Sequence, residues 1–228
     1  MVDHLTSSTV WPTTTRATAG SSLLGRAALF VAFSLAFTLL GGFVANSLQI
    51  SRPVISIASL VGLACVLLLA WLREVPVVNL GLMYGMAFSM GLIVGPALDA
   101  YVRAGYSGFV YEAAGLTAAL TLALSAFELT TRRDFSRLED YLFFALLGLI
   151  AAGVASQFLR IPYLHLGLGL VGSLVFCLFV VVDVRKARDL EDTAGNAVLL
   201  AVNVYLDILN LCLYLLRLLV EIAASSDD

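Results

Sequence analysis

Seven apolar segments, each long enough to cross a lipid bilayer, fill almost the whole of this 228-residue chain. They are residues 23–45, 54–72, 77–98, 107–129, 138–159, 163–184 and 195–220. A membrane-spanning α-helix needs about 20 consecutive apolar residues, and only helices and closed barrels satisfy all their backbone hydrogen bonds in hydrocarbon. The chain is therefore predicted to be an all-α membrane protein with seven transmembrane helices, embedded in the lipid bilayer.

The composition excludes the main soluble classes. Hydrophobic residues make up 61% of the chain and charged residues 13%, whereas soluble domains carry about 25% charged residues. The formal net charge of −3 offers no basic surface that could follow a phosphate backbone, so no nucleic-acid partner is expected. Cys65, Cys177 and Cys212 lie far apart inside apolar segments, without the spacing of a zinc or iron–sulfur site.

The chain divides into three parts. Residues 1–22 are rich in Ser and Thr without an apolar face, which predicts a flexible tail. Residues 23–222 form the transmembrane domain, and residues 223–228 form a short acidic tail. Two glycine pairs in the third segment, Gly81/Gly85 and Gly91/Gly95, have the small-xxx-small spacing that lets neighbouring helices approach closely.

Basic residues predict the orientation. With the N-terminus inside, nine of the 13 basic residues fall on the inner side, which favours a cytoplasmic N-terminus and, after seven spans, an external C-terminus. These nine are Arg16, Arg26, Arg73, Arg132, Arg133, Arg137, Arg185, Lys186 and Arg188. Lys186 is the only lysine, and this preference for arginine is typical of a GC-rich genome, which favours a bacterial inner membrane.

The seventh segment carries a stripe of polar residues. They are Asn196, Asn203, Asp207, Asn210, Tyr214 and Arg217, at intervals of 7, 4, 3, 4 and 3 that place them on one face of a helix. Lipid would leave such a stripe unsatisfied, so it must face the protein interior or a water-filled path. We expect Asn203, Asn210 and Tyr214 to line a pore. The alternative is that the stripe only hydrogen-bonds neighbouring helices together.

Asp183, in the sixth segment, is a candidate partner for Asp207. A turn near residue 195 would place the two carboxylates at similar depth on adjacent antiparallel helices. Ionising both of two neighbouring carboxylates costs electrostatic free energy, so the pair would share a proton at low pH. At higher pH, the two charges would repel each other or bind a cation between them. Such a pair is a pH-sensitive latch. The alternative places Asp183 at the interface, paired with Arg185 or Lys186.

Calcium is the cation that fits this pair best. Ca²⁺ prefers oxygen ligands, and Asp183 and Asp207 could bind it transiently with help from the side-chain carbonyls of Asn203 and Asn210. No other cofactor is expected. Glu112, in the fourth segment, is expected to line the outer entrance of the path, with pairing to Arg103 or Arg160 as the alternative.

The same residues carry a family resemblance. Val204-Tyr205-Leu206-Asp207-Ile208-Leu209-Asn210-Leu211 and the following Leu215-Leu216-Arg217, with Asp183 in the preceding helix, resemble the Bax inhibitor-1 (transmembrane Bax inhibitor motif) family, in particular its small bacterial members. The similarity covers about residues 23–228.

This resemblance implies six helices around a central seventh and a pH-regulated Ca²⁺ leak in which Asp183 and Asp207 are the pH sensor. Arg73 matches a basic position that holds the latch closed in some members. Those members have an acidic residue in the second helix, whereas residues 54–72 contain none and Gly62 stands near the expected place.

Two other functions compete with the leak. Relatives are also described as modulators of membrane proteases and of cell-death machinery, a role that needs a surface and no pore. Intramembrane aspartyl proteases also place two aspartates on the sixth and seventh helices, but their Tyr-Asp and Gly-x-Gly-Asp motifs are replaced here by Val182-Asp183 and Leu206-Asp207. The chain is therefore not expected to be an enzyme, and we expect a monomer.

Overall fold

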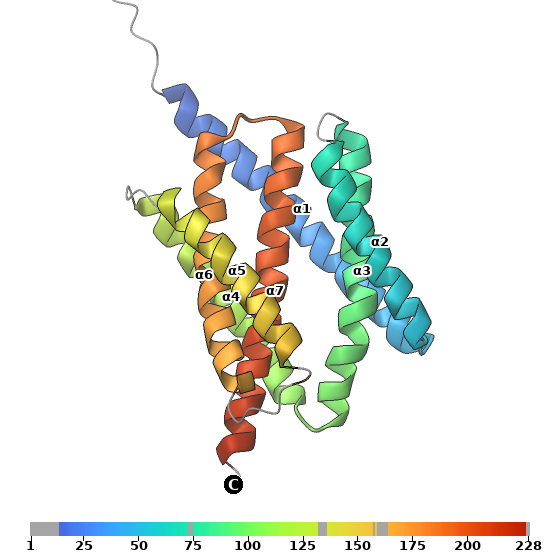
Figure 1. Ribbon diagram of the computed structural model, residues 1–228. Coiled ribbons are helices and arrows are strands. Elements are labelled where there is room, and N and C mark those ends of the chain that lie inside the picture. Colours follow the sequence, from blue (N-terminus) through green and yellow to red (C-terminus); the bar gives the residue numbers. More distant parts are fainter. Residues whose placement is uncertain (1–13, 73–74, 132–135, 157, 159–163, 227–228) are drawn as a thin grey trace, which may run out of the picture.

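The computed structural model describes residues 14–72, 75–131, 136–156, 158 and 164–226. They form seven long α-helices and no strand, as Figure 1 shows. The helices are α1 (Thr14–Ser47), α2 (Arg52–Trp71), α3 (Pro76–Arg103), α4 (Ser107–Thr130), α5 (Ser136–Ala155), α6 (Leu164–Asp189) and α7 (Ala194–Ser226). Each contains a stretch that is apolar and long enough to cross a membrane. The prediction of an all-α protein with seven transmembrane helices is confirmed.

Local sequence explains where several helices begin and end. Proline lies in the first turn of α2 and of α3, where its missing N–H costs no intrahelical hydrogen bond. Gly105, with φ of 92°, follows α3 and provides the left-handed conformation that often ends a helix. α1 begins at Thr14, inside the stretch predicted as a flexible tail. The Ser22 and Arg26 side chains bind Asp192 in the α6–α7 turn, which fixes this end of α1 on the bundle.

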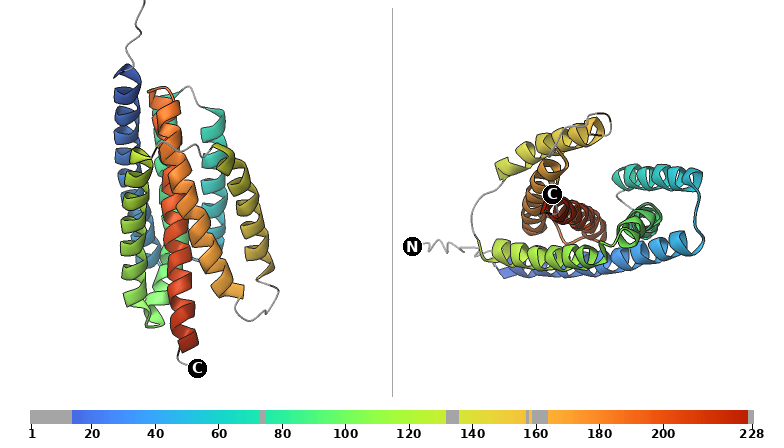
Figure 2. Two further views of the ribbon diagram at one scale, coloured as in Figure 1. Left: turned by 90° about the vertical axis from the view of Figure 1, so that its left-hand side faces the viewer. Right: turned by 90° about the horizontal axis from the view of Figure 1, so that it is seen from below.

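α7 lies at the centre of the bundle, as the view along the helices in Figure 2 shows. It packs against α6, α4, α1 and α3, while α2 packs on α3 and α5 on α6. α6 shares the interior, because its buried residues run from Leu168 to Ala187. Four residues of α7, Leu200, Tyr205, Leu211 and Leu216, are almost fully buried. The prediction of a central seventh helix is therefore confirmed, with α6 as its main partner.

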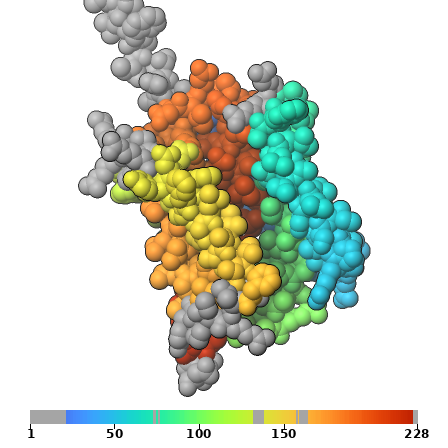
Figure 3. All heavy atoms as spheres, viewed as in Figure 1, coloured from blue at the N-terminus to red at the C-terminus, as the bar shows by residue number. Residues whose placement is uncertain are grey.

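α2 and α5 lie apart on the outside of the bundle and do not close it completely. The space-filling view in Figure 3 shows α7 at the bottom of a hollow between α5, in yellow, and α2, in cyan. Asn203 on α7 is exposed, although α7 is the central helix. The bundle thus leaves part of its central helix accessible from one side.

α1 and α3 cross at a contact made by glycines. A Cβ atom added to Gly91 would lie 2.1 Å from the carbonyl oxygen of Thr38, and one added to Gly95 would lie 2.5 Å from the Cα atom of Gly42. A Cβ atom at Gly81 would meet nothing within 4 Å. Of the two predicted glycine pairs, Gly91/Gly95 therefore brings two helix backbones together, and Gly81 does not.

Candidate functional site

The structure brings Asp183 of α6 and Asp207 of α7 together. Their side chains lie close enough to interact directly, and the two residues are only 3% and 6% exposed. Among the described residues, Oδ2 of Asp207 has no hydrogen-bond partner although it is buried. The two carboxyl groups thus form a buried pair on adjacent helices.

Lys186 provides the positive charge beside this pair. Its Nζ atom lies 3.0 Å from Oδ1 of Asp183 and 2.9 Å from Oε1 of Glu139 on α5. The exposed fraction of the side chains rises from 4% for Asp183 to 31% for Lys186 and 52% for Glu139. A line of charged groups therefore leads from the buried aspartate pair to the surface. Both sequence alternatives for Asp183, contact with Asp207 and pairing with Lys186, occur at once.

Asn203 and Asn210, the amides on either side of Asp207 in α7, differ from each other in exposure and in hydrogen bonding. Asn210 is half-buried, and its Nδ2 atom donates a hydrogen bond of 2.8 Å to the carbonyl oxygen of Leu206 in its own helix. Asn203 is exposed. The amide of Asn210 therefore hydrogen-bonds within its own helix, whereas the side chain of Asn203 lies at the surface of the bundle.

The C-terminal part of the polar stripe, Tyr214 and Arg217, packs against α6. The Tyr214 ring stacks on Phe176 at a centroid distance of 5.6 Å and lies over Gly172, where a Cβ atom would come within 2.3 Å of the ring. Arg217 contacts Nδ1 of His165. The polar residues of the stripe therefore do not share one environment. Tyr214 and Arg217 contact α6 and connect α7 to it.

Two predicted site residues lie away from the aspartate pair or outside the described residues. Glu112 is exposed on α4, whereas its neighbour Ala113 is fully buried. Arg73, the predicted basic partner of the latch, lies outside the described residues. In the described part of the chain, the base beside the pair is Lys186.

The described side chains around the pair do not form a stable cation site. Ca²⁺ takes six to eight oxygen ligands in its stable sites, and the described residues contain no group of three or more His, Cys, Asp or Glu side chains able to hold a metal. The ammonium group of Lys186 already neutralises Asp183. A cation would have to displace this group to reach both carboxylates.

Sequence reasoning missed several buried polar groups. Glu128 on α4 is fully buried, with Oε1 3.8 Å from Nη1 of Arg188. Asn79 on α3 is also fully buried, and its amide has no partner among the described residues. Lys186, by contrast, was predicted as an alternative partner of Asp183, and its i, i+3 spacing places both on one helix face.

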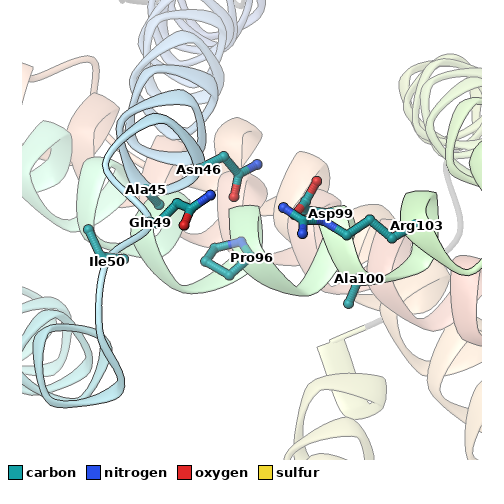
Figure 4. A pocket seen from close by; sticks show the side chains of 8 residues that line it. All are labelled: Ala45, Asn46, Gln49, Ile50, Pro96, Asp99, Ala100 and Arg103. Carbon is teal, nitrogen blue, oxygen red and sulfur yellow. The ribbon is translucent and has the colours of Figure 1, made fainter.

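A second polar pocket lies between the C-terminal ends of α1 and α3, shown in Figure 4. It has a volume of 370 Å³ and contains the side chains of Asn46, Gln49, Asp99 and Arg103. Its one carboxylate, Asp99, is 2.7 Å from Nε of Arg103. This pair already balances the charge, so the pocket is a weaker candidate for a cation site than the aspartate pair.

Comparison with known proteins identifies a family of relatives for this chain. The family model described as "Inhibitor of apoptosis-promoting Bax1" matches residues 21–225. The Golgi anti-apoptotic protein of vaccinia virus (strain Lister) is 35% identical over 73% of this chain and 69% of its own length. Protein lifeguard 4 of Mus musculus is 30% identical over 74% of this chain and 69% of its own length.

A bacterial relative is also similar. The modulator of FtsH protease YccA of Escherichia coli (strain K12) is 30% identical over 61% of this chain and 64% of its own length. The family model covers all seven described helices except the first residues of α1 and the last residue of α7. The chain therefore belongs to the family of inhibitors of apoptosis-promoting Bax1.

Proposed function

We propose that this protein is a pH-sensitive calcium leak of the membrane, gated by the Asp183–Asp207 pair between α6 and α7. The observation that carries the proposal is the close approach of two buried carboxyl groups on the packed helices α6 and α7. While they share a proton, the pair holds α6 and α7 together. When that proton is lost, two buried negative charges repel each other, and a cation such as Ca²⁺ can bind between them.

The charges around the pair define how the gate opens. Lys186 stabilises the ionised form of Asp183, and Glu139 competes for the same ammonium group. Flux is therefore expected to be low in acid and to rise with pH, because only the deprotonated pair repels. Asn203, exposed one turn before Asp207 on α7, would offer the next oxygen to an ion that leaves the pair.

The test is calcium flux into liposomes. Purified protein is reconstituted around an encapsulated Ca²⁺ dye, and the external pH is stepped between about pH 6 and about pH 8, where a coupled carboxyl pair can exchange its proton. The wild type should conduct Ca²⁺ more rapidly at the higher pH. The double variant Asp183→Asn/Asp207→Asn cannot titrate, so its flux should no longer depend on pH.

The matched control is Glu112→Gln, which removes a carboxylate from the exposed face of α4. It should leave the midpoint of the pH profile unchanged, and a slower flux at all pH values would place Glu112 at the entrance of the path. Absence of wild-type flux, or a double variant that keeps the full pH dependence, would refute the leak.

A second candidate function is modulation of a membrane protease. It is favoured by the printed name of the Escherichia coli relative, modulator of FtsH protease. A modulator acts through a surface, so it would not need the aspartate pair to titrate. Preserved protease modulation in the double Asp→Asn variant, together with absent Ca²⁺ flux in the wild type, would favour this function over the leak.

A further inference from the structure

A large apolar groove lies on the side of α7 that faces away from the aspartate pair. It has a volume of 630 Å³, in the range of ligand pockets, which is about 300–1,000 Å³. Its floor is formed by α7 residues Ile208, Leu209, Cys212, Leu213 and Leu216. A helix turns about 100° per residue, so these side chains centre on the face opposite Asp207.

The groove lies between α1 and α4, which make little direct contact with each other. α4 rests on α6, α7 and α3, whereas α1 rests on α3, α7 and α6. One wall is formed by Leu35, Thr38 and Leu39 of α1, and the other by α4 residues between Val110 and Leu122. All of these lie within segments long and apolar enough to span the membrane. The groove is therefore surrounded by the hydrocarbon of the bilayer.

The rim of the groove is accessible from the lipid. Leu39, Tyr111 and Leu122 are 75%, 79% and 72% exposed. Tyr111 lies one turn from the start of α4, at Ser107, where a tyrosine can place its hydroxyl at the membrane interface. A chain can therefore enter from the bilayer and reach α7.

The polar groups of the lining are mostly occupied by the protein. The Thr38 hydroxyl lies 2.7 Å from the Tyr205 hydroxyl and 3.1 Å from the carbonyl oxygen of Ala87. The Thr117 hydroxyl donates a hydrogen bond of 2.7 Å to the carbonyl oxygen of Ala113. Among the described lining residues, the Thr121 hydroxyl is the buried one without a partner. A polar ligand would therefore find few unpaired hydrogen-bonding groups, whereas an apolar chain would enter without breaking a hydrogen bond of the lining.

From this lining, its depth and its open rim, we infer that the groove is a binding site for one acyl chain of a membrane lipid. The surrounding bilayer supplies such chains at the highest concentration of any apolar ligand. The occupant would fill the space between α1 and α4 and support α7 on the side opposite Asp183. This inference does not depend on calcium conduction.

The test uses a lipid with a photoreactive diazirine in the middle of its acyl chain. The full-length protein is reconstituted in phosphatidylcholine vesicles that contain a small fraction of this lipid, irradiated, and its adducts are mapped by mass spectrometry. Adducts should concentrate on groove residues such as Leu213 and Thr117. They should exceed those at Phe143 and Phe144 on the outer face of α5, which are 55% and 69% exposed. An even distribution over exposed residues would overturn the inference.

A pair of neighbouring alanines provides the matched variants. Ala118 lines the groove and Ala119 does not, although both are exposed on α4. Ala118→Phe should reduce the groove adducts to the level found on α5, and Ala119→Phe should leave them unchanged. Equal adducts in the two variants would also overturn the inference.

The variant Thr121→Val tests whether the occupant is apolar. Unlike Ala118→Phe, it adds no bulky side chain to the groove. It removes the unpaired hydroxyl and nearly preserves the shape of the side chain, so an acyl chain should be retained as well as in the wild type or better. A clear loss of adducts in this variant would indicate a polar ligand and would refute the acyl chain.

Discussion

Lys186 forms ion pairs with carboxylates from two different helices, α5 and α6. A buried carboxylate without a partner is strongly destabilising, and an ammonium group can donate up to three hydrogen bonds. One lysine can therefore satisfy Asp183 and Glu139 together, at 3.0 Å and 2.9 Å. This arrangement places a positive charge next to the aspartate pair, so under the proposed gating mechanism this charge should set the pH at which the pair opens.

Replacing Lys186 by Met tests this effect. Loss of the ammonium group removes a charge that favours the ionised form of Asp183, so the pair should keep its shared proton to a higher pH. A charged hydrogen bond contributes about 1.5 kcal/mol, which corresponds to about one pH unit. The midpoint of the calcium-flux profile should therefore move up by about one unit.

The control for this experiment is Arg26→Gln. Arg26 pairs with Asp192 in the α6–α7 turn, so this variant removes a basic side chain from the same end of the bundle without touching the aspartate pair. It should leave the midpoint unchanged. A downward shift in Lys186→Met, or equal shifts in the two variants, would contradict the role given to Lys186.

The sequence predicted the residues of the pair better than their environment. Asp183 and Asp207 were found because an ionisable residue inside an apolar segment is rare and their spacing suits a helical hairpin. Helix periodicity placed Asn203, Asn210 and Tyr214 on one face, but not their neighbours. The contacts of Tyr214 with Gly172 and Phe176 depend on how α6 is rotated, which a single segment does not encode.

At the scale of helices, α1 and α3 can cross at close range because glycines at the contact have no side chains to separate the backbones. Gly91 lies so close to α1 that any Cβ atom would overlap a backbone carbonyl oxygen. Backbone atoms cannot move aside as a flexible side chain can. The whole crossing would therefore have to open to accept even a methyl group.

Gly91→Ala should destabilise the protein by about 1–3 kcal/mol, the usual cost of inserting extra atoms into a packed contact. Gly81→Ala, on the same helix, meets nothing within 4 Å and should be neutral or slightly stabilising, because alanine favours the helix over glycine by about 1 kcal/mol. Thermal unfolding in one detergent measures both. Similar melting temperatures for the two variants would show that the crossing tolerates separation.

The two glycine pairs of α3 also show that a small-xxx-small motif does not determine which neighbouring helix it contacts. Gly81/Gly85 and Gly91/Gly95 have the same spacing, which indicates that close approach is possible. Which pair is used depends on where α1 crosses α3, and Gly41/Gly42 of α1 meet the second pair. The helices themselves followed directly from the length of the apolar segments, because that length is fixed by the thickness of the bilayer.

For the whole molecule, the distribution of basic residues predicts a cytoplasmic N-terminus and an external C-terminus. Single cysteines at Asp192 and Ser225 test this, because these residues lie at opposite ends of the bundle, in the α6–α7 turn and at the end of α7. In intact cells, a membrane-impermeant thiol reagent should label Ser225→Cys and should label Asp192→Cys only after permeabilisation. The reverse pattern would invert the topology and place the aspartate pair nearer the outer face.

The central position of α7 also affects how the protein is made. Chains are synthesised from the N-terminus and fold as they emerge, so the helix that contacts α1, α3, α4 and α6 is the last of the seven to enter the membrane. Until then the faces of those four helices that will cover α7 have only lipid or one another to pack against. The bundle therefore cannot complete its core until α7 has entered the membrane, and the contacts that close this core form late in assembly.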